Sequence, residues 1–486
     1  RRTPPAHRRR WLAAGVALAV GGAVLAAVGA AGTAPTVILA GLALGELGLV
    51  FATPTLVGLL ARLGRSLPLA PRIALRDASR NRSSTAPAIS AVMAAVAGSV
   101  AIGVYLASDQ SRTSAIYQPT LPSGTVLVTW YGPDGPPPLA SIAGAARAHL
   151  GARTVAPLVE AGCGTAEKSC AVSPVLPPER ACPWTPGDRL SPAEQRQARA
   201  DARCRIGPED RLGLYFQVVV DDGTALPALT GADPADVAAA TAVLRAGGVV
   251  VTNPRYVVDG RVDVAVTRSG QSSPEAPAVT TVAGHPLRTG LGVNRLLLSR
   301  PAAERLGLTV QPLGWAITAD GVPDEHREER FLATVRPTGA QVEIERGEPV
   351  NPQRPLLLLL AAAAGVITVG AAGIATGLAA AEGRADLSTL AAVGAGPGLR
   401  RLLSLCQSGV IAVLGSALGI VAGLGSALII LTAVNRRYAG LWPVAEPYPV
   451  VVPWATLGVL VVVPLVAMLG AGLFTRSRLP VERRLD

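Results

Sequence analysis

The hydrophobic pattern separates long apolar runs near the two ends of the chain from a mixed central segment. Six runs reach the roughly 20 residues that an α-helix needs to cross about 30 Å of hydrocarbon. They are Trp11–Gly32, Thr36–Leu60, Thr85–Ala107, Leu356–Ala379, Leu402–Val434 and Trp454–Phe474. The pattern therefore predicts an α-helical polytopic membrane protein with six spans.

The central segment, residues 108–354, changes its periodicity every few residues. Thr125–Trp130 and Arg261–Thr267 alternate like half-buried strands, whereas Asp236–Ala246 has helical spacing. Short strands mixed with short helices predict an inserted α+β domain. Residues 171–212 are rich in proline and charge, and we expect a long surface loop there.

These elements predict four parts. They are a two-span N-terminal hairpin (1–69), an amphipathic helix with the third span (70–107), the α+β domain (108–354), and a three-span core (355–486) with a cytoplasmic loop at 380–401. The chain starts with Arg1 and Arg2 rather than Met. We interpret this start as an internal cut or a processed end, and we expect a longer natural chain.

The formal net charge of +11 is unevenly distributed. Residues 108–354 hold 24 basic and 26 acidic residues, whereas the rest of the chain holds 20 and 7. Basic residues beside apolar spans are typical of the cytoplasmic side of a membrane protein rather than of nucleic-acid binding. If the spans alternate, the C-terminus is cytoplasmic and the α+β domain is extracytoplasmic, in a bacterial inner membrane.

Four of the five cysteines lie in the central segment: Cys163, Cys170, Cys182 and Cys204. An even number in an oxidising compartment favours two disulfides, for which three pairings exist. A zinc site is the alternative, but the spacing contains no C-x-x-C pair and no histidine lies nearby. Cys406 falls at the membrane, where a small packing residue is expected.

Motifs for catalysis and nucleotide binding are missing from the sequence. The only lysine, Lys168, has no glycine-rich lead, so the chain has no P-loop. The four histidines are scattered, and His326 lies in a charged run typical of a solvated helix face. We expect no catalytic, cofactor or metal residues in this chain, and no enzymatic activity.

Small residues recur four apart in two of the predicted spans. Gly415, Gly419 and Gly423 lie in the fifth span, and Gly373 and Gly377 in the fourth. Such glycines let another helix approach closely. The sequence leaves open whether that helix belongs to a second subunit or to the same bundle.

Two further features concern the membrane. Glu46 lies about ten residues into the second span, where a carboxylate is either functional or hydrogen-bonded to a neighbouring helix. Between the second and third spans, residues 70–84 alternate Ile73, Ala74 and Ala78 with arginines. This pattern predicts an amphipathic helix on the cytoplasmic membrane face, which could also contact a cytoplasmic partner.

The loop Glu382–Gly396 contains Glu382, Arg384 and Asp386, then Leu387 and Leu390, and ends in Val393-Gly394-Ala395. It resembles the signature of FtsX-like ABC transporter permeases, in which a charged E-R-x-x-E start leads through a short apolar helix to an L-G-A core. Asp386 replaces the second acid, and Ala391 stands where a basic residue is usual. The run Arg72–Arg82 resembles the entry segment of that family, and Gln407 stands where its members often have Glu.

The resemblance covers about residues 70–475 and implies a function. Such permeases resemble the macrolide-efflux and lipoprotein-releasing transporters. They work as homodimers or paired modules with separate cytoplasmic ATPase subunits, which hold the ATP. ATP-driven motion would reach the extracytoplasmic domain, for export or extraction of a lipoprotein, peptide or drug. The residues expected to couple to the ATPase are Glu382, Arg384, Asp386, Leu387, Leu390, Val393 and Gly394.

The two leading spans resemble the linker pair of larger members, so the chain is expected to be the C-terminal half of a two-module protein. Two other classes of function remain. One is a membrane-anchored sensor or scaffold for cell-envelope processes, which needs no ATP. The other is a membrane enzyme, for which clustered catalytic residues are missing from the sequence.

Overall fold

A computed structural model describes residues 5–32, 34–63, 66, 68–80, 82–130, 138–163, 169–205, 207, 216–269, 276–348, 354–382, 397–454, 457–458 and 462. The chain forms two compact units. The helical unit comprises Arg1–Ala115, Asn351–Gly440 and Val444–Asp486. The sheet unit comprises Ile116–Val350 together with Leu441–Pro443. The sheet unit thus begins later than residue 108, because the helix before it continues to Ile116.

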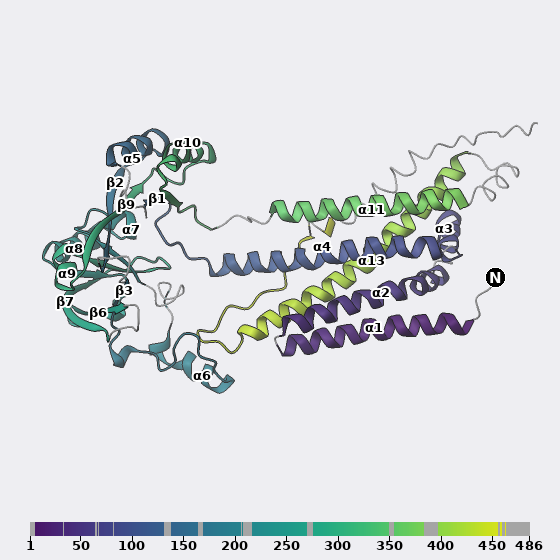
Figure 1. Cartoon of the computed structure of the whole chain (residues 1–486), viewed down its shortest axis with the longest axis horizontal. Coiled ribbons are helices and arrows are strands. Elements are labelled where there is room, and N and C mark those ends of the chain that lie inside the picture. The colour runs from purple at the N-terminus through teal and green to yellow at the C-terminus, as the bar shows by residue number, and fades with distance from the viewer. Residues whose placement is uncertain are drawn as a thin grey trace, which may run out of the picture. The chain divides into compact units, whose positions relative to one another are not determined.

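Long helices build the helical unit (Figure 1). They are α1 (Pro5–Ala31), α2 (Pro35–Leu63), α3 (Leu69–Arg80), α4 (Arg82–Ile116), α11 (Arg354–Glu382) and α13 (Pro397–Tyr438). Within the described residues four stretches are long and apolar enough to cross a membrane: Ala13–Ala31, Pro35–Gly58, Thr85–Ile116 and Leu405–Tyr438. A shorter apolar stretch, Pro355–Ala371, lies in α11. The expected sixth span, Trp454–Phe474, falls largely outside the described residues.

The surface of α1 shows why these helices suit hydrocarbon. Val16, Val20 and Val24 are four residues apart, so they share one helix face, and they are 48%, 57% and 57% exposed. In a water-soluble protein, a helix would bury such an apolar stripe against the protein core. The predicted class, a polytopic helical membrane protein, is therefore supported by four helices with the required length and apolar surface.

Ten strands of the described residues form one mixed sheet in the sheet unit, in the order β10-β1-β9-β2-β4-β8-β5-β7-β6-β3. The strands are β1 (Thr125–Thr129), β2 (Thr154–Gly162), β3 (Ser169–Pro174), β4 (Phe216–Val220), β5 (Val249–Val251), β6 (Arg261–Ser269), β7 (Ala278–Pro286), β8 (Asn294–Leu298), β9 (Thr309–Thr318) and β10 (Gln341–Ile344). The helices are α5 (Leu139–Ala145), α6 (Pro192–Ala200), α7 (Leu226–Thr230), α8 (Pro234–Arg245), α9 (Arg300–Arg305) and α10 (Glu325–Val335). The predicted α+β class is confirmed.

The core of the sheet unit lies on both faces of the sheet. Leu297 of β8 packs in one buried cluster with residues of α7 and α8, whereas Leu296 and Leu298 pack in another with α9. Because successive side chains point to opposite faces, the three leucines of β8 serve both clusters, and all five of its residues are buried, the polar Asn294 and Arg295 included.

The prediction of a long surface loop at residues 171–212 is wrong in part, because this segment contains the helix α6. Ser191 caps this helix: its hydroxyl accepts from the amide of Glu194, and the Glu194 carboxylate accepts from the amide of Ser191 at 2.7 Å. This reciprocal capping box satisfies two amides that would otherwise lack partners. The sequence signal, serine three residues before glutamate, was masked by the surrounding prolines and charges.

Candidate functional site

Of the seven residues expected to couple to an ATPase, the structure describes one. Glu382 is the last residue of α11. The other six, Arg384, Asp386, Leu387, Leu390, Val393 and Gly394, lie outside the described residues. Their role stays a prediction from the sequence.

The glycines of the fifth span face α4 of the same chain. A Cβ added to Gly419 would lie 2.7 Å from the carbonyl oxygen of Met93 and 2.8 Å from the Cβ of Val96. Gly415 and Gly423 meet Val92 and Val100 equally closely. These distances are shorter than real Cβ contacts, so the glycines form a packing seam within one chain. Gly373 and Gly377 lie in α11, and their surroundings are outside the described structure.

A second close seam joins α1 to α2, and it was not predicted from the sequence. A Cβ on Gly22 would lie 2.3 Å from the amide nitrogen of Gly45, and a Cβ on Gly48 would lie 2.2 Å from that of Ala19. The signal is a row of small residues three and four apart: Gly15, Ala19, Gly22, Ala26 and Gly29. Glu46 follows Gly45 on α2 and is half-buried.

The amphipathic helix α3 packs on α13 as well as on α2. Its Ala74, Leu75 and Ala78 are buried in a cluster that also contains Val57, Val410 and Ile411. In addition, Nε2 of Gln407 donates a hydrogen bond of 2.6 Å to Oδ2 of Asp77. Leu69 and Ile73 remain 62% and 42% exposed. The predicted amphipathic helix is therefore present, and it joins the start of α13 to the entry of α4.

A carboxylate ties together the two ends of the sheet unit. The chain enters at Ile116 and leaves at Val350. Glu345, 9% exposed, accepts hydrogen bonds from the Tyr117 hydroxyl at 2.5 Å, the Thr120 amide at 3.1 Å and the Gly347 amide at 3.0 Å. A longer bond of 3.4 Å comes from the amide of Leu121. We call Tyr117, Thr120, Leu121, Glu345 and Gly347 the Glu345 clasp.

The clasp holds the carboxylate in its charged form. Burial by itself raises the pKa of Glu345, but the hydrogen bonds from Tyr117 and the backbone amides outweigh burial and lower that pKa. Burial and the bond to Glu345 raise the pKa of Tyr117 to about 12. No local pattern in the sequence predicts the clasp, because Tyr117 lies 228 residues from Glu345.

Thr120 is also held from its carbonyl side. Nη2 of Arg295, a residue of β8 that is 1% exposed, donates to the Thr120 oxygen at 2.6 Å. Among the described residues, Nε and Nη1 of Arg295 have no hydrogen-bond partner. Burial lowers the pKa of Arg295 to about 10. A buried guanidinium with a single hydrogen-bond partner is expected to destabilise the folded state, because its desolvation costs more free energy than one bond contributes.

Two disulfides stabilise the sheet unit, as expected, and the structure decides their pairing. Cys163 pairs with Cys170, and Cys182 pairs with Cys204. Cys406 is a free, half-buried cysteine of α13. No group of three or more His, Cys, Asp or Glu residues in the described part of the chain is placed to hold a metal ion.

Three residues that follow α13 belong to the sheet unit rather than to the helical unit. Trp442 is 6% exposed, its amide donates to the Asp188 oxygen at 2.9 Å, and its oxygen accepts from the Gly187 amide at 2.7 Å. Leu441 also forms a β-bridge with Arg189. We call this contact the Trp442 anchor. It binds the segment that the Cys182–Cys204 disulfide closes, and the sequence did not predict it.

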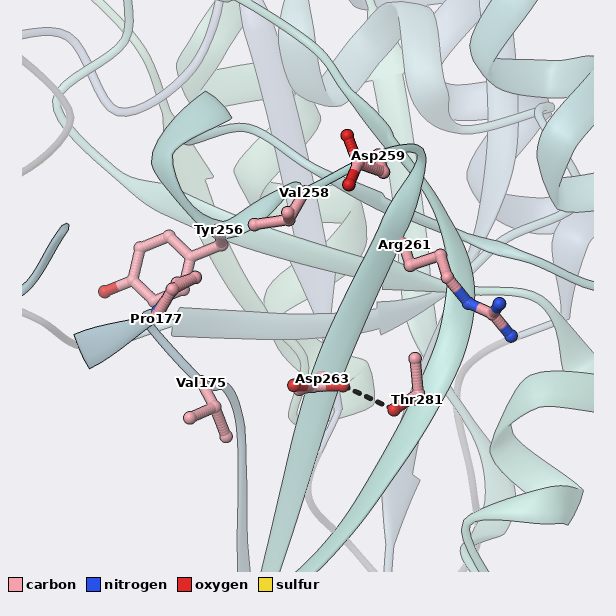
Figure 2. A pocket seen from close by; sticks show the side chains of 8 residues that line it. All are labelled: Val175, Pro177, Tyr256, Val258, Asp259, Arg261, Asp263 and Thr281. Carbon is pink, nitrogen blue, oxygen red and sulfur yellow. Dashed lines mark hydrogen bonds between the residues drawn. The ribbon is translucent and has the colours of Figure 1, made fainter. Parts of the chain in front are cut away.

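The sheet unit also contains a cavity of about 480 Å³ (Figure 2). Its apolar lining residues are Val175, Pro177, Tyr256 and Val258, and its polar ones are Asp259, Arg261, Asp263 and Thr281. Asp259 and Gly260 have φ of 47° and 72° in the tight turn that leads into β6, as an Asp-Gly hairpin turn requires. Figure 2 shows Asp263 bonded to Thr281, and the Arg261 side chain extending away from Tyr256 and Pro177.

Two arginines join the segments that form the apolar wall of the cavity. The Arg180 guanidinium donates to the carbonyl oxygens of Arg255 and Val257 at 3.0 and 2.9 Å. In return, Nη2 of Arg255 donates to the oxygens of Arg180 and Arg203 at 2.6 and 2.5 Å. We call this set the arginine clamp. Because Arg203 adjoins Cys204, the clamp connects the cavity wall to the disulfide that supports the Trp442 anchor.

The chain matches no protein-family model and no curated protein. Its class therefore rests on its own structure: apolar helices of membrane-spanning length and a separate sheet unit with two disulfides.

Proposed function

We propose that the chain is the membrane-spanning permease subunit of an ABC transporter of the FtsX-like family, with the C-terminus in the cytoplasm of a bacterial cell. In this proposal the chain has six spans: the four described above, a fifth in α11 and a sixth at residues 454–474. Separate cytoplasmic ATPase subunits bind the ATP, and a second copy or module completes the transporter. The sheet unit then acts outside the membrane on a lipoprotein, peptide or drug.

One observation carries this proposal. Two positions compared with the family are more than 300 residues apart, yet they meet in space: Asp77 of the entry run accepts a hydrogen bond from Gln407 of α13. The helix α13 begins immediately after the loop Glu382–Gly396. A partner bound to that loop would therefore act directly on a helix that is packed against α3 and α4.

The proposal is tested by purification of the tagged full chain from native membranes, with mass spectrometry and an ATPase assay. A P-loop ATPase in a fixed ratio is the expected result. Replacing Leu387, Leu390 and Val393 together by glutamate is expected to abolish copurification. The matched control replaces Val279 and Val322, which are 55% and 45% exposed in the sheet unit, by glutamate and leaves the ATPase bound.

A sensor or scaffold is the second candidate, and the cavity in the sheet unit favours it. Such a protein would bind a ligand at the cavity without ATP. A preparation in gentle detergent with an intact loop and no ATPase would reject the transporter and support this alternative.

A further inference from the structure

We propose that the cavity between Tyr256 and Asp263 binds a small organic cation with an apolar body, and that this ligand strengthens the Trp442 anchor. The inference does not depend on the transporter function. It combines the chemistry of the cavity wall with the bonds that connect this wall to the anchor.

The cavity has a preformed apolar side. Tyr256 is 6% exposed, and its ring packs edge-on against Phe216 with centroids 5.0 Å apart. Pro177 and Val175 come from the segment after β3, and the arginine clamp holds that segment to the Tyr256 segment. A wall fixed in this way loses little entropy when an apolar group packs on it. The volume is within the range of small-molecule sites.

The polar side selects positive charge. Asp259 and Asp263 provide two carboxylates, whereas the single cationic side chain, Arg261, extends away from the apolar wall in Figure 2. Asp263 already accepts a hydrogen bond of 2.5 Å from Thr281, which orients the carboxylate beside the cavity. An ammonium group can therefore bind Asp263 while its apolar body contacts Tyr256 and Pro177, and Asp259 adds a second negative charge to the lining. An anion would face two carboxylates and one guanidinium, so it is expected to bind more weakly than a cation.

The connection to the anchor follows from the same bonds. A ligand that touches both Pro177 and Tyr256 holds together the two segments joined by the arginine clamp. The clamp reaches the oxygen of Arg203, next to Cys204, and the disulfide leads from there to the segment that binds Trp442. A ligand that stabilises the cavity wall therefore reduces local opening at the Trp442 anchor, because the hydrogen bonds and the disulfide connect the two sites without a break.

Three probes with the same ring and different charge test the proposal on the full chain in nanodiscs: phenethylammonium, 2-phenylethanol and phenylacetate. Ligand-detected NMR is expected to show binding of the ammonium compound, at least fivefold tighter than of the other two. Asp259→Asn with Asp263→Asn is expected to weaken ammonium binding at least fivefold. The matched control, Asp236→Asn on the exposed surface of α8, removes a charge without effect.

Hydrogen exchange measures the second part. The amides of Gly187 and Trp442, which donate the two bonds of the anchor, are expected to exchange at least threefold more slowly with phenethylammonium present. An unchanged thermal unfolding midpoint shows that the double variant is folded. Equal binding of all three probes, or unaltered binding by the double variant, overturns the site. Binding without slower exchange at these two amides overturns the connection.

Discussion

The Glu345 clasp allows a prediction whose size follows from the hydrogen bonds. In the variant Glu345→Gln, one oxygen becomes an amide group that donates instead of accepting. If it replaces Oε2, the amides of Thr120 and Leu121 lose their acceptor; if it replaces Oε1, the Gly347 amide does. Each orientation therefore leaves at least one backbone donor unpaired.

The expected cost is about 2–3 kcal/mol, since hydrogen bonds to charged groups contribute about 1.5–3 kcal/mol and an unpaired buried donor costs about 1–3 kcal/mol. For a unit of 150–250 residues, 1 kcal/mol shifts the melting temperature by about 2–4 °C. We therefore expect the sheet unit of Glu345→Gln to unfold about 4–12 °C lower. Hydrogen exchange should also become faster at Thr120 and Leu121 if the amide group replaces Oε2, or at Gly347 if it replaces Oε1.

The assay is differential scanning fluorimetry of the full chain in nanodiscs, combined with hydrogen exchange by mass spectrometry. The control is Glu329→Gln, the same change at an exposed position of α10. A melting temperature within 1 °C of the unmodified chain, with unchanged exchange at Thr120, Leu121 and Gly347, would show that the clasp does not hold the two ends of the sheet unit.

Four further predictions use the same preparation. The pKa of Glu345 is lowered in the fold, so the stability that its carboxylate contributes is complete above the ordinary pKa of about 4.3 and is lost as pH falls through the folded pKa. The pKa of Tyr117 is raised, so the stability that its hydroxyl contributes is complete below about pH 10 and is lost as pH rises towards 12. A pH series of melting temperatures that Glu345→Gln leaves unaltered would contradict both expectations. Gly419→Leu should cost about 1–3 kcal/mol because the new side chain meets Met93 and Val96, while Gly425→Leu, with nothing within 4 Å of an added Cβ, should not destabilise the helices. Arg295→Met should raise the free energy of unfolding by about 1–2 kcal/mol, and a lower melting temperature would show that the buried charge is needed. Replacing Cys182 and Cys204 by serine should lower the free energy of unfolding by about 3 kcal/mol and speed hydrogen exchange at the Trp442 amide. The same replacement of Cys163 and Cys170 should leave exchange at that amide unaltered.

The sequence by itself determined the long apolar helices, the start of α8 and the presence of disulfides, because each depends on residues close together in the chain or on composition alone. Membrane-spanning helices need only length and apolar composition, so the runs of α1, α2, α4 and α13 were readable directly. The start of α8 was also predictable, because Asp233 accepts from the Ala235 amide two residues away and Pro234 follows it. An even number of cysteines predicted two disulfides without their pairing.

Some strands were decided by their neighbours rather than by their own residues. β2 contains Pro157 and β7 contains Gly284, and both residues lower the propensity for a strand interior. Pairing of β2 with β9 and of β7 with β6 overcomes this weakness. At Gly284 a Cβ would lie 2.3 Å from Cγ2 of Val262, so the glycine permits the close approach of these two strands.

Only the tertiary structure decided the contacts that carry the proposals. Tyr117 and Glu345, Asp77 and Gln407, and Gly187 and Trp442 are each separated by more than 200 residues. No periodicity or motif specifies such pairs, because each hydrogen bond depends on where two distant segments are brought together by packing. The sequence determined which segments are apolar, capped or cross-linked; the fold determined that the ends of the sheet unit share one carboxylate and that the loop after α13 is anchored to it.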